Sequence, residues 1–160
     1  MNALNLRVLF SLLSVLALVP EAGAQPVHFK TLVIDQAYAR ATAPGQEVGV
    51  IYMTIENTGK QDQHLLTATA PVARAVTLHS THMSGGMSSM HRQASFAIPA
   101  GSKLELQPSG LHLMLEGLKK PLVEGKQIVV RLRFEPAGEV EVPVPVRSMG
   151  AGPGMGSMHH

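Results

Sequence analysis

The sequence has no cysteine and no tryptophan, and its aromatic residues are limited to four Phe and two Tyr. Without cysteine the chain forms no disulfides, and it lacks the thiolate that binds structural zinc and blue copper. This absence disfavours an electron-transfer cupredoxin, because the copper of that class is held by one Cys and two His.

Strong charge is also missing. The formal net charge is +2, and Lys119 and Lys120 are the only adjacent Lys or Arg residues. With no basic patch interleaved with aromatics, we expect no nucleic-acid partner. The sequence also shows no Ser/His/Asp constellation, no paired catalytic carboxylates and no phosphate-binding Gly loop, so we expect no enzyme.

A long apolar run occurs at the N-terminus and is not repeated. Arg7 precedes an apolar stretch from Val8 to Val19, and the small residues Ala22-Gly23-Ala24 follow. This pattern predicts a secretory signal peptide over residues 1–24, cleaved after Ala24, and a periplasmic location. A transmembrane anchor is the alternative, but the run is short for a bilayer span.

The rest of the chain reads as β-structure. Apolar residues alternate with polar ones in short segments, and Pro or Gly turns separate them. Eight strands are expected, the clearest at 31–40, 48–57, 64–70, 74–80, 103–107, 111–118, 127–136 and 139–147. This all-β pattern over 25–147 predicts an antiparallel β-sandwich or Greek-key barrel, and it leaves immunoglobulin-like and cupredoxin-like topologies both open. Residues 148–160 have too few large apolar side chains to pack, which predicts a flexible tail.

Histidine and methionine are concentrated in "LHSTHMSGGMSSMHRQASF" (78–96), among Ser, Thr and Gly. We interpret this window as a mobile, solvent-facing loop in which methionine has no core to fill. The segment "LHLML" adds His112 and Met114, which share one face of a strand while Leu113 faces the core. Imidazole with thioether, and no thiolate, favours Cu(I) over zinc, magnesium or calcium.

The spacing of four His and Met residues is more specific than their composition. His79, Met90, His112 and Met114 form an H-x10-M-x21-H-x-M pattern, which resembles the signature of the periplasmic copper chaperone family PCuAC. The phrases "AYARATAPGQ", "YMTIENTG" and "IPAGSKLELQPSGLHLMLEGLKKPLVEG" are similar to that family as well, and the resemblance runs from about Val33 to Val146.

The resemblance implies a cupredoxin-like Greek-key barrel that holds Cu(I) through His79, Met90, His112 and Met114. It also implies delivery of copper to the dinuclear centre of cytochrome c oxidase, alongside a thiol-bearing assembly factor. Two further groups are candidate ligands: His82, Met83, Met87 and His91 in the loop, and Met149, Met155, Met158, His159 and His160 in the tail, where Cu(II) is expected.

Other functions stay open at this point. A periplasmic copper storage or resistance protein would use the same ligands. A β-sandwich interaction module would carry these His and Met residues incidentally. A copper oxidase is disfavoured, because methionine equals histidine in number at the expected site.

Overall fold

The computed structural model describes residues 24–150 and 152, and these form strands and turns with no helix. No part of this described region is therefore a helix with the length and apolar character of a membrane span. The eleven strands are β1 (Val27–Phe29), β2 (Leu32–Arg40), β3 (Val48–Asn57), β4 (Gln63–Thr69), β5 (Ala73–Ser84), β6 (Met87–Gln93), β7 (Phe96–Ile98), β8 (Lys103–Leu106), β9 (Leu111–Leu118), β10 (Gln127–Glu135) and β11 (Gly138–Arg147).

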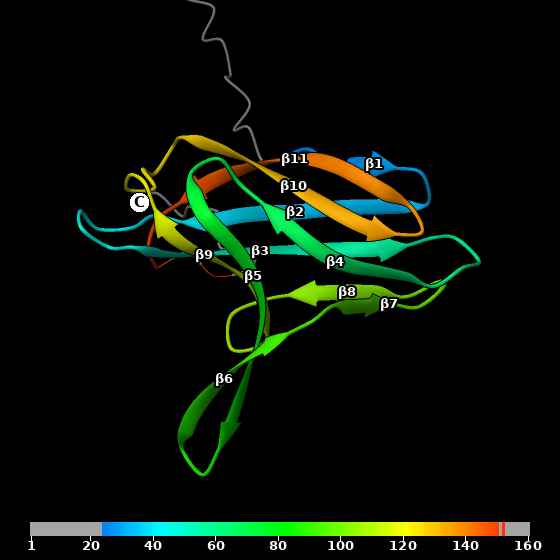
Figure 1. Ribbon diagram of the computed structural model, residues 1–160, viewed down its shortest axis with the longest axis horizontal. Helices are drawn as coiled ribbons and strands as arrows, with labels where there is room; N and C mark the ends of the chain where they lie inside the picture. Colours follow the sequence, from blue (N-terminus) through cyan, green and yellow to red (C-terminus); the bar gives the residue numbers. More distant parts are fainter. Residues whose placement is uncertain (1–23, 151, 153–160) are drawn as a thin grey trace, which may run out of the picture.

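Seven of these strands close into a barrel (Figure 1). The ring runs β5–β9–β3–β2–β11–β10–β4 and returns to β5 through the pair Ala68 and Val76. Its neighbours are antiparallel except for β11 and β2, which run parallel. The all-β barrel expected from the alternating pattern is thus confirmed, and β3 and β9 have the bounds that the sequence predicts.

The barrel interior is filled by one face of each strand. In β10, Val130, Leu132 and Phe134 are buried while the residues between them are exposed. Leu113 and Leu115 of β9 are fully buried in the same core. Because of this alternation, the opposite face of β9 lies on the outside of the barrel wall, and this face carries His112 and Met114.

The His/Met window is not a loop, and that interpretation was wrong. It forms a β-hairpin, in which β5 and β6 pair continuously from Leu78–Gln93 to Ser84–Met87. The turn is Gly85-Gly86, and both residues have positive φ (57° and 79°), as a two-residue type I′ turn requires. Past Ser80 the strand β5 leaves β9, and the rest of the hairpin extends away from the barrel as a two-stranded arm (Figure 1).

A bulge in β2 changes which residues of this strand face the outside of the barrel. The β2–β3 register shifts between Asp35 and Tyr38, and Gln36 in the bulge has a φ of 53°. The extra residue turns Tyr38 to the outer face, opposite the core residues Ala37 and Ala39. Tyr38 then packs on Tyr52 of β3, with ring centroids 5.3 Å apart, in a small cluster separate from the main core.

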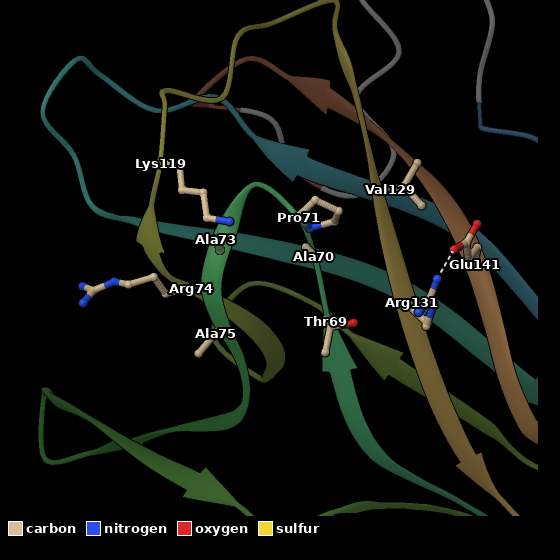
Figure 2. Close-up of a pocket in the computed structure, with 10 residues that line it drawn as sticks. All are labelled: Thr69, Ala70, Pro71, Ala73, Arg74, Ala75, Lys119, Val129, Arg131 and Glu141. Carbon is tan, nitrogen blue, oxygen red and sulfur yellow. Dashed lines mark hydrogen bonds and ion pairs between the residues drawn. The ribbon is translucent and has the colours of Figure 1, made fainter.

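The seam between β4 and β5 opens into a groove, because these strands share a single pair. Its volume is about 360 Å³. Arg131 and Glu141 form an ion pair on one wall, and Ala73 and Lys119 lie across from them (Figure 2). None of the predicted metal ligands that lie within the described residues lines this groove, so the candidate site lies elsewhere.

Candidate metal centre

The strand registers bring the four predicted ligands to one face. His79 of β5 is paired with His112 of β9, and Met114, two residues on, is paired with Thr77. Met90 of β6 is paired with Thr81, two residues from His79 on β5. Since residues two apart share a face, all four side chains lie on the same side of the three-stranded β6–β5–β9 sheet.

The two imidazoles form the floor of this site. Their ring centroids are 5.8 Å apart with an interplanar angle of 22°, so they lie nearly parallel. His112 is 4% exposed, and the Tyr52 ring meets it edge-on at 6.5 Å. His112 lies on the outer face, as the sequence predicts, but the tyrosine cluster and His79 cover it.

Hydrogen bonds fix which nitrogen of His79 is free. Thr77 Oγ1 lies 2.6 Å from Glu116 Oε1 and 2.9 Å from His79 Nε2. A carboxylate only accepts, so the Thr77 hydroxyl donates to Glu116 and accepts from the Nε2–H of His79. The lone pair of His79 is then on Nδ1, which is buried and has no hydrogen-bond partner in the described part of the chain.

In His112 the nitrogen that lacks a partner in the described region is Nε2, whereas in His79 it is Nδ1. Its Nδ1–H donates to the carbonyl oxygen of Gly110 at 3.2 Å, because a carbonyl only accepts. Its Nε2 is left with the lone pair, and this atom too is buried without a partner among the described residues. Buried polar atoms are normally hydrogen-bonded. A bound soft cation would accept a lone pair from each of these two unpartnered nitrogens on neighbouring rings.

The protonation state of His112 also favours metal binding. Burial lowers the pKa of His112 below its usual 6.5, and the neighbouring His79 adds to this effect, while the bond to Gly110 opposes it. The ring therefore stays neutral through the near-neutral range and keeps its lone pair available.

The two methionines give the site an open side. Met114 is half-buried, whereas Met90, on the projecting arm, is 49% exposed. Among residues 24–150 no three His, Cys, Asp or Glu side chains are grouped closely enough to hold a metal. A metal bound here would need sulfur ligands beside the two imidazoles, and that donor set suits a soft ion such as Cu(I).

Of the four other candidate ligands in the hairpin, Met83 alone shares this face. Met83 lies on the same face near the hairpin tip and is 63% exposed, but His82, Met87 and His91 project from the opposite face. Met149 is described and is 62% exposed. Met155, Met158, His159 and His160 lie outside the described residues, as does most of the predicted signal peptide.

Comparison with known sequences identifies the family. Residues 32–146 match the family model described as "Putative lipoprotein LpqE-like". The chain belongs to the LpqE-like family. A relative from Leifsonia xyli subsp. xyli (strain CTCB07), "Putative lipoprotein Lxx21020", is 37% identical over 115 residues, which cover 71% of this chain and 68% of the relative.

Solved structures similar to this LpqE-like chain include copper-binding domains. The copper-bound PCuAC domain from PmoF2 superimposes with a TM-score of 0.68 at 22% identity, covering 78% of this chain and 98% of that domain. At that identity the likeness shows the fold alone. The Cu(I) form of DR1885 from Deinococcus radiodurans is 31% identical to this chain, with a TM-score of 0.57. The match covers 81% of this chain and 85% of the DR1885 chain.

Sequence reasoning missed the residues that orient the imidazoles in this LpqE-like chain. Thr77 lies two residues before His79, and Glu116 lies two residues after Met114. The same period-2 argument that paired His112 with Met114 would have placed both on the site face. The Tyr52 contact had no such signal, because it depends on the β3–β9 pairing.

Proposed function

We propose that this LpqE-like protein is a non-catalytic copper chaperone that binds one Cu(I) through His79, Met90, His112 and Met114. Support comes from two kinds of observation. Similar structures include the copper-bound PCuAC domain from PmoF2 and Cu(I)-bound DR1885. The chain also carries an H-x10-M-x21-H-x-M spacing that resembles the signature of the PCuAC family.

The observation that carries the proposal is the pair of orphaned nitrogens. His79 Nδ1 and His112 Nε2 are buried and unpartnered within the described region, on rings 5.8 Å apart. Two uncharged nitrogens and two uncharged thioethers bind a monovalent copper ion without charge pairing, which suits reversible holding. The exposed Met90 is the ligand that an acceptor reaches first, and we expect transfer to begin there.

We further propose that the protein acts in the periplasm. The sequence-predicted signal peptide and the lipoprotein relative support export. The acceptor we propose is the copper centre of cytochrome c oxidase, reached directly or through a thiol-bearing assembly factor. A thiolate-bearing acceptor binds Cu(I) more strongly than neutral thioethers do, so transfer in that direction is downhill.

A Cu(I) competition titration with a chromogenic chelator tests binding. We expect one tightly bound Cu(I), mixed nitrogen and sulfur scattering in X-ray absorption, and weak zinc binding. His64→Ala, an exposed histidine on β4, is the matched control and should bind Cu(I) as the unaltered protein does. A first shell of nitrogen and oxygen alone would overturn the assignment.

A transfer assay tests delivery and separates the alternatives. The Cu(I)-loaded protein is mixed with the apo copper domain of the oxidase, with and without the assembly factor, and the dinuclear centre is followed by its absorption. A storage or resistance protein would bind Cu(I) and retain it. A β-sandwich interaction module would bind no copper.

A further inference from the structure

The arm carries a second group of metal-binding side chains on the face opposite the first site. On β5 this face presents Ser80, His82 and Ser84, and on β6 it presents Met87, Ser89 and His91. The same face of β5 carries the core residue Leu78 inside the barrel. Its side chains change from apolar to Ser and His where β5 leaves β9, so the barrel core does not explain the histidines.

The register places the two histidines as neighbours. His82 is paired with Ser89, which makes His91 and Met87 its two diagonal neighbours across the strands. The ring centroids of His82 and His91 are 5.7 Å apart, close to the 5.8 Å between His79 and His112. The two-residue Gly85-Gly86 turn fixes this register, so the pair is set by the backbone.

This separation suits one shared metal ion. With a metal–nitrogen distance of about 2 Å, two imidazoles on one ion have ring centroids roughly 4–6.5 Å apart. The rings are tilted by 53°, and each Nε2 is hydrogen-bonded to a serine hydroxyl, Ser80 at 3.2 Å and Ser89 at 3.3 Å. Gln93 Nε2 donates to Ser80 Oγ at 2.9 Å, which ties the His82 ring to the sheet.

We infer that His82 and His91 form a second metal site, which binds Cu(II). Both residues are exposed, so water completes the coordination. Two imidazole nitrogens with water favour Cu(II), which also binds such ligands more tightly than the other divalent first-row ions. Met87 shares the face but is a poor ligand for Cu(II). The inference extends the proposed copper-carrier role, yet it uses none of the four residues of the first site.

Cu(II) titration of the full mature chain, followed by electron paramagnetic resonance, tests this site. We expect nitrogen hyperfine structure from two imidazoles in the unaltered protein. His82→Ala and His91→Ala should each lower Cu(II) affinity by at least about tenfold. Loss of a residue that only orients a metal ligand already costs about 10–100-fold, and loss of a direct ligand should cost no less. His64→Ala is the matched control and should leave the signal unchanged.

Two more variants separate this inference from its rivals. Met114→Ala should keep the Cu(II) signal while weakening Cu(I) binding, because Met114 belongs to the first site. A form ending at Arg147 should also keep the signal. Loss of the Cu(II) signal in that form, or its survival in that form when His82→Ala or His91→Ala is added, would overturn the inference. Failure of the unaltered protein to bind Cu(I), with an intact Cu(II) signal, would instead count against the proposed function.

Discussion

The orientation of His79 depends on a single hydroxyl. Thr77 accepts from His79 Nε2–H and donates to Glu116, so it links a half-buried imidazole to a carboxylate that is 42% exposed. Groups that orient a metal-binding His in this way typically contribute 10–100-fold to metal affinity. The ring of His79 is therefore positioned by Thr77 and Glu116, which lie outside the proposed ligand set.

Replacing Thr77 with Val tests this positioning role. Valine has nearly the same shape but no hydroxyl, so Cu(I) affinity should fall by about 10–100-fold. Thr77→Ser keeps the hydroxyl and should retain most of the affinity. Cu(I) competition titrations of both variants, with thermal unfolding as a check on the fold, measure the effect. Equal affinities of the Val and Ser variants would contradict it.

Leu113 and Met114 offer a test of the two faces of β9. Leu113 is fully buried in the core, so Leu113→Ala should lower the free energy of unfolding by about 2–5 kcal/mol. Met114→Ala should weaken Cu(I) binding with a smaller loss of stability, because its side chain is half-buried. Denaturant unfolding and Cu(I) titration together distinguish these outcomes. The reverse pattern would mean that the faces are assigned the wrong way round.

His112 shows where alternation along a strand reaches its limit. Period 2 correctly separates His112 from the core residue Leu113, but it says nothing of what covers the outer face. That cover comes from Tyr52 and His79, which reach His112 through pairings between distant strands. A sequence reading therefore predicts the side of the strand but not the burial. His112→Ala should consequently cost stability as well as copper binding.

At the scale of elements, the arm was the largest difference from expectation. The Ser, Thr and Gly residues of segment 78–96 predict a loop. A two-stranded arm without a core face, however, needs no β-branched or large apolar residues. Gly85-Gly86 between two segments of equal length was the available hairpin signal. The strands of the barrel were predictable because each has a buried face that enforces alternation.

The turn of the arm gives a prediction about register. Gly85 has a φ of 57°, and a Cβ there would meet no atom within 4 Å, so any effect of substitution is conformational. Gly85→Val should disfavour the turn by about 1–2 kcal/mol, the cost of a left-handed non-glycine residue, and more for a β-branched one. Because Met90 is held by this register, Cu(I) affinity should fall.

Gly85→Asn is the matched control, because Asn-Gly is a preferred type I′ turn and tolerates positive φ. It should retain Cu(I) affinity and the cross-strand NMR contacts between Thr81 and Met90. The thermal midpoint of the barrel should stay close to the original in both variants, since the arm lies outside the core. A Val variant with intact cross-strand contacts and unchanged affinity would show that the turn does not set the position of Met90.

At the scale of the whole molecule, the tyrosine cluster beside the proposed copper site should make stability depend on pH in the alkaline range. Tyr38 and Tyr52 are buried in their own cluster, and the Arg147 guanidinium lies 4.7 Å from the Tyr38 ring centroid. Burial raises the pKa of both phenols above the usual 10, although Arg40 opposes this at each and Arg147 also opposes it at Tyr38. The Tyr38 hydroxyl has no hydrogen-bond partner among residues 24–150, which is consistent with this direction.

The sign of the effect follows from these raised values. The unfolded chain releases the phenolic protons near pH 10, before the folded protein does, so the folded state is favoured most below pH 10. The free energy of unfolding should fall as pH rises above about 10 and through the raised pKa values. Tyr38→Phe removes one of the two groups, so its loss of stability should be shallower. At neutral pH this variant should be no less stable, because it removes an unpartnered hydroxyl.

Denaturant unfolding at about pH 9 and about pH 11, on the metal-free protein and on Tyr38→Phe, measures this difference. The chain has two tyrosines and no tryptophan, so tyrosinate absorbance reports these two groups directly. The two proteins differ only at residue 38, so the comparison removes the shared contribution of the other ionisable side chains. Parallel loss of stability in the two proteins would mean that the Tyr38 phenol ionises as easily folded as unfolded, and that the wall covering His112 is open to solvent.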